Sequence, residues 1–211
     1  EALKGRRSRY PGQTRVGYDL KLFDLFALKM IHKGLFFSAA AVILQTDGYF
    51  RPSEVLNFLG RDIIAPNRRV NSGVWGVVLG NSESGVPTKN LSYDDTTLFN
   101  TPSRNDVGDL VKWLSHGKLD TDQRIFGSLT LSQYEKHFRE VGALLGLKNL
   151  TISPHLARHS AASSDSFHKI RSIEEIRERG HWRCPSSCGR YKKPGRMLLQ
   201  NNRISEDVWQ L

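Results

Sequence analysis

The chain has 211 residues, of which 38% are hydrophobic and 25% are charged, and its formal net charge is +10. This length suits one well-filled domain, and the proportions are those of an ordinary globular protein. The longest apolar stretch, residues 35–44, is far short of the ~20 residues that cross a bilayer, which excludes a membrane-spanning protein, and the surplus of positive charge favours a polyanionic partner.

The first part of the chain predicts a basic arm followed by helices. Residues 1–16 are basic and lack periodicity, which predicts a linker or the end of a missing DNA-binding domain that precedes a domain at 17–211. Apolar residues at three- and four-residue steps over 20–31 predict a helix, and the almost wholly apolar run 35–45 is typical of a buried one. Pro52 suits the first position of a short helix, where a missing N–H costs nothing.

The middle of the chain predicts a small sheet. Between 61 and 100 the sequence changes to short runs rich in Val, Ile, Trp and Thr that are separated by turn residues. Strands are clearest at 74–79 and 96–99, with a long polar hairpin segment between them. Helical periodicity resumes at 107–114 and 134–145. The predicted fold is a mostly helical α+β domain with a three-stranded antiparallel sheet.

The positive charge is concentrated near the two ends of the chain. Residues 4–21 hold six basic residues against one acidic residue, and residues 155–203 hold eleven against four, whereas residues 22–154 are nearly neutral. Nucleic acid is therefore the expected partner, and a solvated basic surface without a ligand is the alternative.

The cysteines indicate the cellular compartment. Cys184 and Cys188 are too few and too close in sequence for the disulfide framework of a small secreted protein. We therefore expect an intracellular protein, in the nucleus if the source is eukaryotic. His181 and the two cysteines could offer three ligands to zinc, but a closed structural site takes four. Zinc is a minor alternative, and we expect neither a metal nor a cofactor.

The first candidate functional residue is Arg51, in the segment TDGYFRPSE between the buried helix and the short helix that follows. An arginine at such a junction cannot easily point into the core, so it is a candidate for binding an anion. The alternative is structural, because Arg51 could pair with Glu54 three residues on, which is worth roughly a few tenths of a kcal/mol on a helix surface.

The second candidate is the segment SPHLARHS. Pro154 opens a helix there, and His155, Arg158 and His159 fall within one turn on the same side. The free N–H groups and the dipole of a helix start add to the side-chain charge and favour phosphate. A capping histidine with a solvent-exposed arginine is the alternative.

The third candidate is Tyr191, in the segment GHWRCPSSCGRYKK. It is the only tyrosine of six with basic neighbours on both sides. A phenol has a pKa of about 10 and becomes a useful nucleophile only where positive charge favours the phenolate. Tyr191 is therefore a candidate nucleophile, and a core residue or a base-stacking residue are the alternatives.

In chain order the motifs are an arginine, a lysine, HxxRH, GH or GW, and a tyrosine. In this order the sequence resembles the tyrosine recombinases (phage integrase-like) from about residue 15 to the end. Arg51 resembles the family's first arginine, with the usual acidic residue three places on. His155 and Arg158 match the HxxR pair. Lys89, in GVPTKN, falls in the predicted hairpin where the family keeps its lysine, and it is the only lysine between positions 33 and 112.

The last motif departs from the family pattern. Bacterial members commonly place GH nine residues before the tyrosine, whereas His181 lies ten before Tyr191 and Trp182 lies nine before it. Some members use a tryptophan at this position, so both residues are candidates to position the phosphate or pack the tyrosine segment. The GVPTK and GHW segments are also similar to recombinases of eukaryotic mobile elements.

The resemblance implies metal-free cleavage and rejoining of double-stranded DNA. Arg51 and Arg158 would hold the non-bridging phosphate oxygens, and Tyr191 would attack phosphorus to give a 3′-phosphotyrosine. Lys89 would protonate the leaving 5′-oxygen, and His155 would assist proton transfer at the tyrosine. The resemblance also implies assembly into a synaptic tetramer on DNA.

Two other functions are open to the same residues. A type IB topoisomerase uses this chemistry to relax DNA, and a catalytically inactive descendant of a recombinase would bind DNA without cutting it. A covalent protein–DNA adduct that disappears in Tyr191→Phe distinguishes an enzyme from a binding protein.

Overall fold

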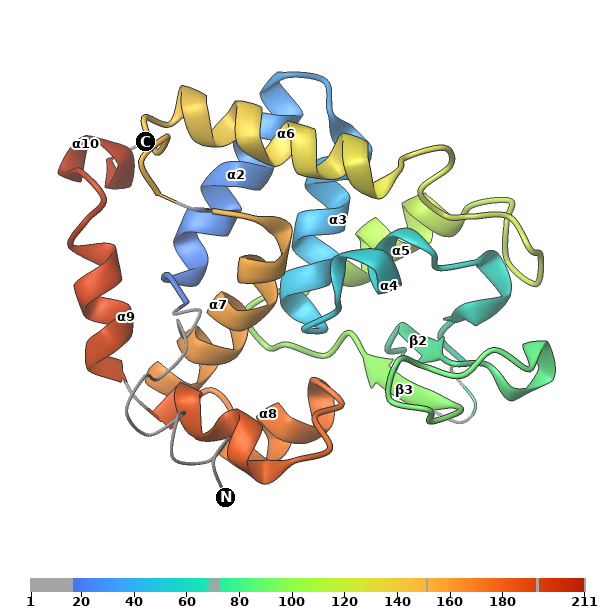
Figure 1. Cartoon of the computed structure of the whole chain (residues 1–211). Coiled ribbons are helices and arrows are strands. Elements are labelled where there is room, and N and C mark those ends of the chain that lie inside the picture. Colours follow the sequence, from blue (N-terminus) through green and yellow to red (C-terminus); the bar gives the residue numbers. More distant parts are fainter. Residues whose placement is uncertain (1–16, 68, 70–72, 151, 193, 211) are drawn as a thin grey trace, which may run out of the picture.

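Most of the described chain is helical, and a small sheet lies at one edge of the helical body (Figure 1). The computed structural model describes residues 17–67, 69, 73–150, 152–192 and 194–210. The expected basic segment at 1–16 lies outside these residues. The predicted α+β class with a three-stranded antiparallel sheet is confirmed.

The α-helices of the described chain are α2 (Leu20–His32), α3 (Phe36–Asp47), α4 (Pro52–Leu56), α5 (Val107–Ser115), α6 (Leu131–Leu144), α7 (Pro154–Phe167), α8 (Ile173–Arg179), α9 (Pro194–Asn201) and α10 (Glu206–Trp209). Among the described residues the 3-10 helices are η1 (Gly60–Asp62), η2 (Ser82–Ser84) and the longer η3 (Pro185–Lys192). The sheet lies between α4 and α5 in the chain, and a long connection, residues 116–130, joins α5 to α6.

The sheet has the order β1-β2-β3, and all its pairs are antiparallel. Its strands are β1 (Ile63–Ile64), β2 (Gly76–Leu79) and β3 (Asp95–Leu98). Val77 in the central strand lies opposite Ile63 on one side and Thr97 on the other. The strand predicted at 74–79 begins two residues later in the structure, although the Trp75 carbonyl still accepts a hydrogen bond from the Phe99 N–H at 2.8 Å.

Helix α3 runs through the centre of the molecule and packs against α2, α4, α5 and α7 (Figure 1). Three successive alanines, Ala39 to Ala41, are buried, and side chains this small let the neighbouring helices approach closely. The predicted burial on all sides is right from Ser38 onward, whereas Phe36 and Phe37 in the first turn are exposed. The helical core is centred on this element.

The C-terminal half of α3 carries buried polar side chains that hold other elements. The Gln45 amide donates to the Pro154 carbonyl at 2.6 Å and accepts from the Tyr134 hydroxyl at 2.9 Å. Asp47 accepts from Arg179 at the end of α8, through its carboxylate Oδ2 at 2.8 Å and through its carbonyl at 2.7 Å. Helix α3 therefore fixes both the start of α7 and the end of α8.

The Asp47–Arg179 ion pair should stabilise the fold strongly. The Asp47 carboxylate is fully buried, and its second oxygen has no hydrogen-bond partner among the described residues. Arg179→Ala leaves the Asp47 charge buried without its cation. We therefore expect urea unfolding to show that the free energy of unfolding falls by about 3–5 kcal/mol.

The matched control is Asp122→Ala, which removes the partner of Arg61 from an ion pair whose acidic side chain is 73% exposed. Loss of such an exposed ion pair should lower the free energy of unfolding by only about 0–1 kcal/mol. Similar small losses for Arg179→Ala and for the control would contradict the assignment of a buried, stabilising pair.

Candidate active site

The first turn of α4 places Arg51 and Glu54 against Arg158. Pro52 occupies the first helical position, so Arg51 becomes the extended residue before the helix. The Glu54 carboxylate accepts the Arg51 backbone N–H at 2.6 Å and also pairs with the Arg51 guanidinium. Its Oε2 lies 3.4 Å from Nη1 of Arg158. One carboxylate thus lies between two guanidinium groups from different helices.

Arg158 is buried in α7, with a relative exposure of 5%. Its Nη2 donates to the carbonyl of Gly180 at 2.6 Å, and its guanidinium lies 4.7 Å from the centre of the Trp182 ring. Burial lowers the pKa of Arg158 to about 10, and the charge of Glu54 opposes part of that shift. The guanidinium therefore stays charged at neutral pH.

Tyr191 lies in η3 and is buried, with its ring against Trp182 at 5.1 Å between centroids. Its hydroxyl is 2.8 Å from Nδ1 of His159. Burial raises the pKa of the Tyr191 phenol above its usual value of about 10, and the charges of Arg158 and Arg190 lower it only in part. Before any ligand binds, Tyr191 is a neutral phenol.

The structure separates the two candidates for the last motif position. Trp182 lies between Arg158 and Tyr191. His181 faces strand β3 instead, with Nε2 at 3.0 Å from Oγ1 of Thr97 and Nδ1 at 3.7 Å from Oδ2 of Asp95. Burial lowers the pKa of the His181 imidazole. Trp182 therefore contacts both the arginine and the tyrosine, while His181 anchors its segment to the sheet.

The glycine before this pair is required by packing. A Cβ atom built on Gly180 would lie 2.0 Å from the ring of Trp182, which no side chain tolerates. The absence of a side chain lets the indole fold back over its own turn and reach Arg158, which is bonded to the Gly180 carbonyl. This close approach explains why a glycine stands two residues before Trp182.

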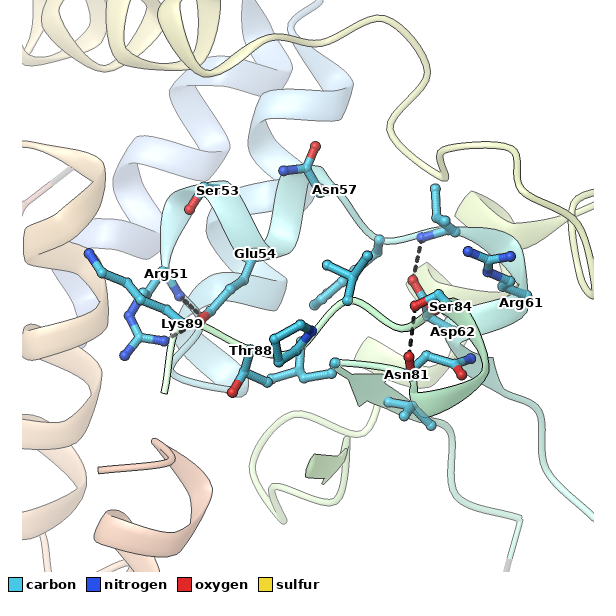
Figure 2. Close-up of a pocket in the computed structure, with 17 residues that line it drawn as sticks. Arg51, Ser53, Glu54, Asn57, Arg61, Asp62, Asn81, Ser84, Thr88 and Lys89 are labelled. Carbon is cyan, nitrogen blue, oxygen red and sulfur yellow. Dashed lines mark hydrogen bonds and ion pairs between the residues drawn. The ribbon is translucent and has the colours of Figure 1, made fainter. Parts of the chain in front are cut away.

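Lys89 is exposed in the segment between β2 and β3, beside a hollow of about 360 Å³ that lies between this segment and α4. Figure 2 shows Arg51, Glu54 and Lys89 at one end of the hollow and Arg61 at the other. The structure thus brings Lys89 to the same opening as Arg51.

Asn90 ties the Lys89 segment to the rest of the site. Its Oδ1 accepts from Nη2 of Arg51 at 3.3 Å, and its Nδ2 donates to the carbonyl of His181 at 2.5 Å. Asn90 belongs to none of the motifs, and its position next to Lys89 is the one signal in the sequence that points to it.

The two histidines of HxxRH occupy different environments. His155 is exposed in the first turn of α7. His159, one turn further on, is half-buried, and it is His159 that is hydrogen-bonded to the Tyr191 hydroxyl. His159, the last residue of the motif, thus contacts the tyrosine hydroxyl, and the role of His155 in proton transfer stays a prediction.

His181, Cys184 and Cys188, the three possible zinc ligands, have different surroundings. His181 pairs with β3, Cys188 is buried and Cys184 is exposed. Within the part of the chain that the structure describes, no group of three His, Cys, Asp or Glu residues could hold a metal ion. The same described residues contain no helix with the length and apolar character of a membrane span.

Comparisons with known proteins identify the fold. No family model and no curated protein match the sequence. The structure is similar to the XerH site-specific recombinase bound to palindromic difH substrate in a post-cleavage complex, with a TM-score of 0.62, 13% identity and coverage of 95% of this chain and 55% of the recombinase chain. A pre-cleavage complex of XerH with difH gives a TM-score of 0.59, 15% identity and coverage of 90% and 52%.

The described chain therefore has the fold of a tyrosine recombinase-like catalytic domain. It spans about half the length of the XerH chains that it matches. At these identities the likeness concerns the fold alone.

The neutral state of Tyr191 can be tested directly. At pH 10 about half of the molecules of an ordinary tyrosine are ionised, whereas the raised pKa of Tyr191 should keep this phenol mostly protonated. The measurement is the NMR shift of a ¹³C label at tyrosine Cζ, with Tyr191→Phe used to assign the resonance. A midpoint at or below that of free tyrosine would mean that the free protein already favours the phenolate.

Proposed function

We propose that this domain cleaves and rejoins double-stranded DNA through a covalent 3′-phosphotyrosine at Tyr191. One observation carries the proposal: a buried tyrosine and a buried arginine contact the same indole ring, with Arg51 linked to that arginine through Glu54. The likeness to a recombinase solved with its DNA substrate supports the same conclusion.

The two arginines are suited to hold one phosphate group. Guanidinium groups match the geometry of phosphate oxygens and stay charged. Arg51 and Arg158 already share one anion, the Glu54 carboxylate, so a phosphate that enters beside them would meet both cations. They would stabilise the charge of the pentavalent transition state.

We place the DNA backbone along the hollow that Arg51 and Lys89 line and along the basic side chains near Tyr191. The hollow beside Arg51 opens between α4 and the segment that carries Lys89. Arg183, Arg190 and Lys192 are exposed in the connection and 3-10 helix that lead to Tyr191. Basic side chains of this kind bind phosphates along a duplex and release condensed counterions.

The reaction then needs no external energy source. Tyr191 attacks phosphorus, the bond to the 5′-oxygen breaks, and the bond energy is stored in the phosphotyrosine for rejoining. Lys89 supplies a proton to the departing 5′-oxygen. Trp182 fixes the positions of Arg158 and Tyr191 relative to each other through its contacts with both. A recombinase of this type would assemble as a synaptic tetramer on DNA.

Formation of the covalent adduct is the decisive experiment. We expect the chain, incubated with a pool of nicked suicide duplexes, to give a protein–DNA adduct that survives denaturant, and sequencing of the trapped DNA would reveal the site. Tyr191→Phe should abolish the adduct and retain DNA binding. Arg158→Ala should lower its rate by on the order of 10²–10³-fold, because the arginine acts mainly on the transition state.

Tyr93→Phe is the control, because Tyr93 is an exposed tyrosine of the β2–β3 segment and should leave the adduct unchanged. DNA binding without any adduct would favour the catalytically inactive DNA-binding protein. Relaxation of supercoiled DNA without strand exchange would favour a type IB topoisomerase-like enzyme.

The role of Lys89 has a separate test. An alkoxide is a poor leaving group, so Lys89→Ala should slow cleavage by on the order of 10²–10⁴-fold. A thiolate leaves readily without a proton, and we expect Lys89→Ala to recover much of its rate when sulfur replaces the bridging 5′-oxygen. Cleavage kinetics on the two substrates provide the measurement.

Arg158→Ala is the matched comparison, because sulfur at the leaving position does nothing for charge on the non-bridging oxygens. This variant should stay slow on both substrates. An equal defect of Lys89→Ala on oxygen and sulfur substrates would mean that Lys89 contacts a phosphate without donating a proton.

A further inference from the structure

The hydroxyl of Tyr191 has an acceptor for its proton inside the fold. Nδ1 of His159 lies 2.8 Å from it, and the two rings are tilted by 32° with centroids 6.2 Å apart. His159 belongs to α7 and Tyr191 belongs to η3, two elements that pack against each other. This hydrogen bond joins the proposed nucleophile to the helix that carries Arg158.

The nucleophile needs such an acceptor. Burial raises the pKa of Tyr191, and the positive charges of Arg158 and Arg190 offset only part of the shift. A phenol in this state cannot attack phosphorus efficiently unless its proton leaves during the attack. The base for that step has to lie within hydrogen-bond reach of the hydroxyl, about 2.6–3.2 Å between heavy atoms.

Within the part of the chain that the structure describes, the other side chains named beside the phenol do not suit this role. Arg158 and Trp182 offer no atom that accepts a proton at neutral pH. Burial raises the pKa of the Cys188 thiol, which therefore keeps its own proton. His155 lies one turn away from His159, exposed at the start of α7.

We infer that His159 is the general base for Tyr191. The inference rests on the proposed function and assigns one step within it. As the bond between Tyr191 Oη and phosphorus forms and the bond from phosphorus to the 5′-oxygen breaks, the Oη proton passes to Nδ1 of a neutral imidazole whose own proton is on Nε2. Lys89 gives a proton to the 5′-oxygen, and in rejoining His159 returns its proton to Oη.

This step requires a particular tautomer of His159. With the proton on Nε2, Nδ1 accepts from the phenol, which the raised pKa of Tyr191 keeps protonated in the free protein. The imidazolium formed during attack would lie beside the phosphate, whose negative charge stabilises it. His159 touches the reacting oxygen, so it is a catalytic residue in this scheme.

The test replaces both the base and the nucleophile. His159→Ala should slow adduct formation by on the order of 10²–10⁴-fold, the usual contribution of a general base. His159→Gln, which keeps a polar side chain but cannot take up the proton, should be similarly slow. Placing a ring-fluorinated tyrosine, whose phenol ionises near neutral pH, at position 191 should shrink the defect of His159→Ala by tenfold or more.

His155→Ala is the matched comparison on the same helix. Any defect that it causes should be the same with tyrosine and with the fluorinated analogue at position 191, because the proposed base is still present. Circular dichroism spectra and DNA affinity should show that both alanine variants are folded.

The outcomes separate this inference from the function on which it rests. Failure of the unsubstituted chain to form any adduct would overturn the proposed function and the base with it. Adduct formation at a near-normal rate by His159→Ala would overturn the base alone. A His159→Ala defect of equal size with both nucleophiles would also overturn it, because a packing defect does not depend on the acidity of the phenol.

Discussion

The guanidinium groups of Arg51 and Arg158, which we propose bind one phosphate, repel each other, and the Glu54 carboxylate between them offsets this repulsion. It accepts the backbone N–H of Arg51, pairs with that residue's guanidinium and lies 3.4 Å from the guanidinium of Arg158. The charge of Arg51 lowers the pKa of Arg158, and the charge of Glu54 raises it. The shared anion holds both guanidinium groups beside the position that we propose for the scissile phosphate.

Burial shifts the pKa values of the two groups that contact Trp182 in opposite directions. It disfavours the charged form of each, so it lowers the pKa of the Arg158 guanidinium and raises that of the Tyr191 phenol. The arginine remains charged and the tyrosine remains neutral at pH 7. In the proposed reaction the phenol gains its charge only during attack, so the reactivity of Tyr191 would depend on a phosphate bound to the arginines.

The sequence predicted the elements whose cause is local. The apolar run at 35–45 and the proline at position 154 gave α3 and the start of α7, because periodicity and a missing N–H act within a few residues. The contacts of the site depend on tertiary packing instead. Asn90 bonds across to Arg51 and His181, and His159 meets Tyr191 of η3, and no spacing along the chain encodes such pairs. The different roles of His181 and Trp182 likewise depend on the position of β3, which His181 contacts.

Helix α3 links the stability of the fold to the geometry of the site. Gln45 fixes the first residue of α7, four positions before Arg158, and Asp47 fixes Arg179, which directly precedes the Gly180 carbonyl bonded to that arginine. Both ends of the Arg158 environment are thus attached to one buried helix. A change in the packing of α3 would therefore alter the distance between Arg158 and the Gly180–Trp182 turn, although α3 itself carries none of the proposed catalytic residues.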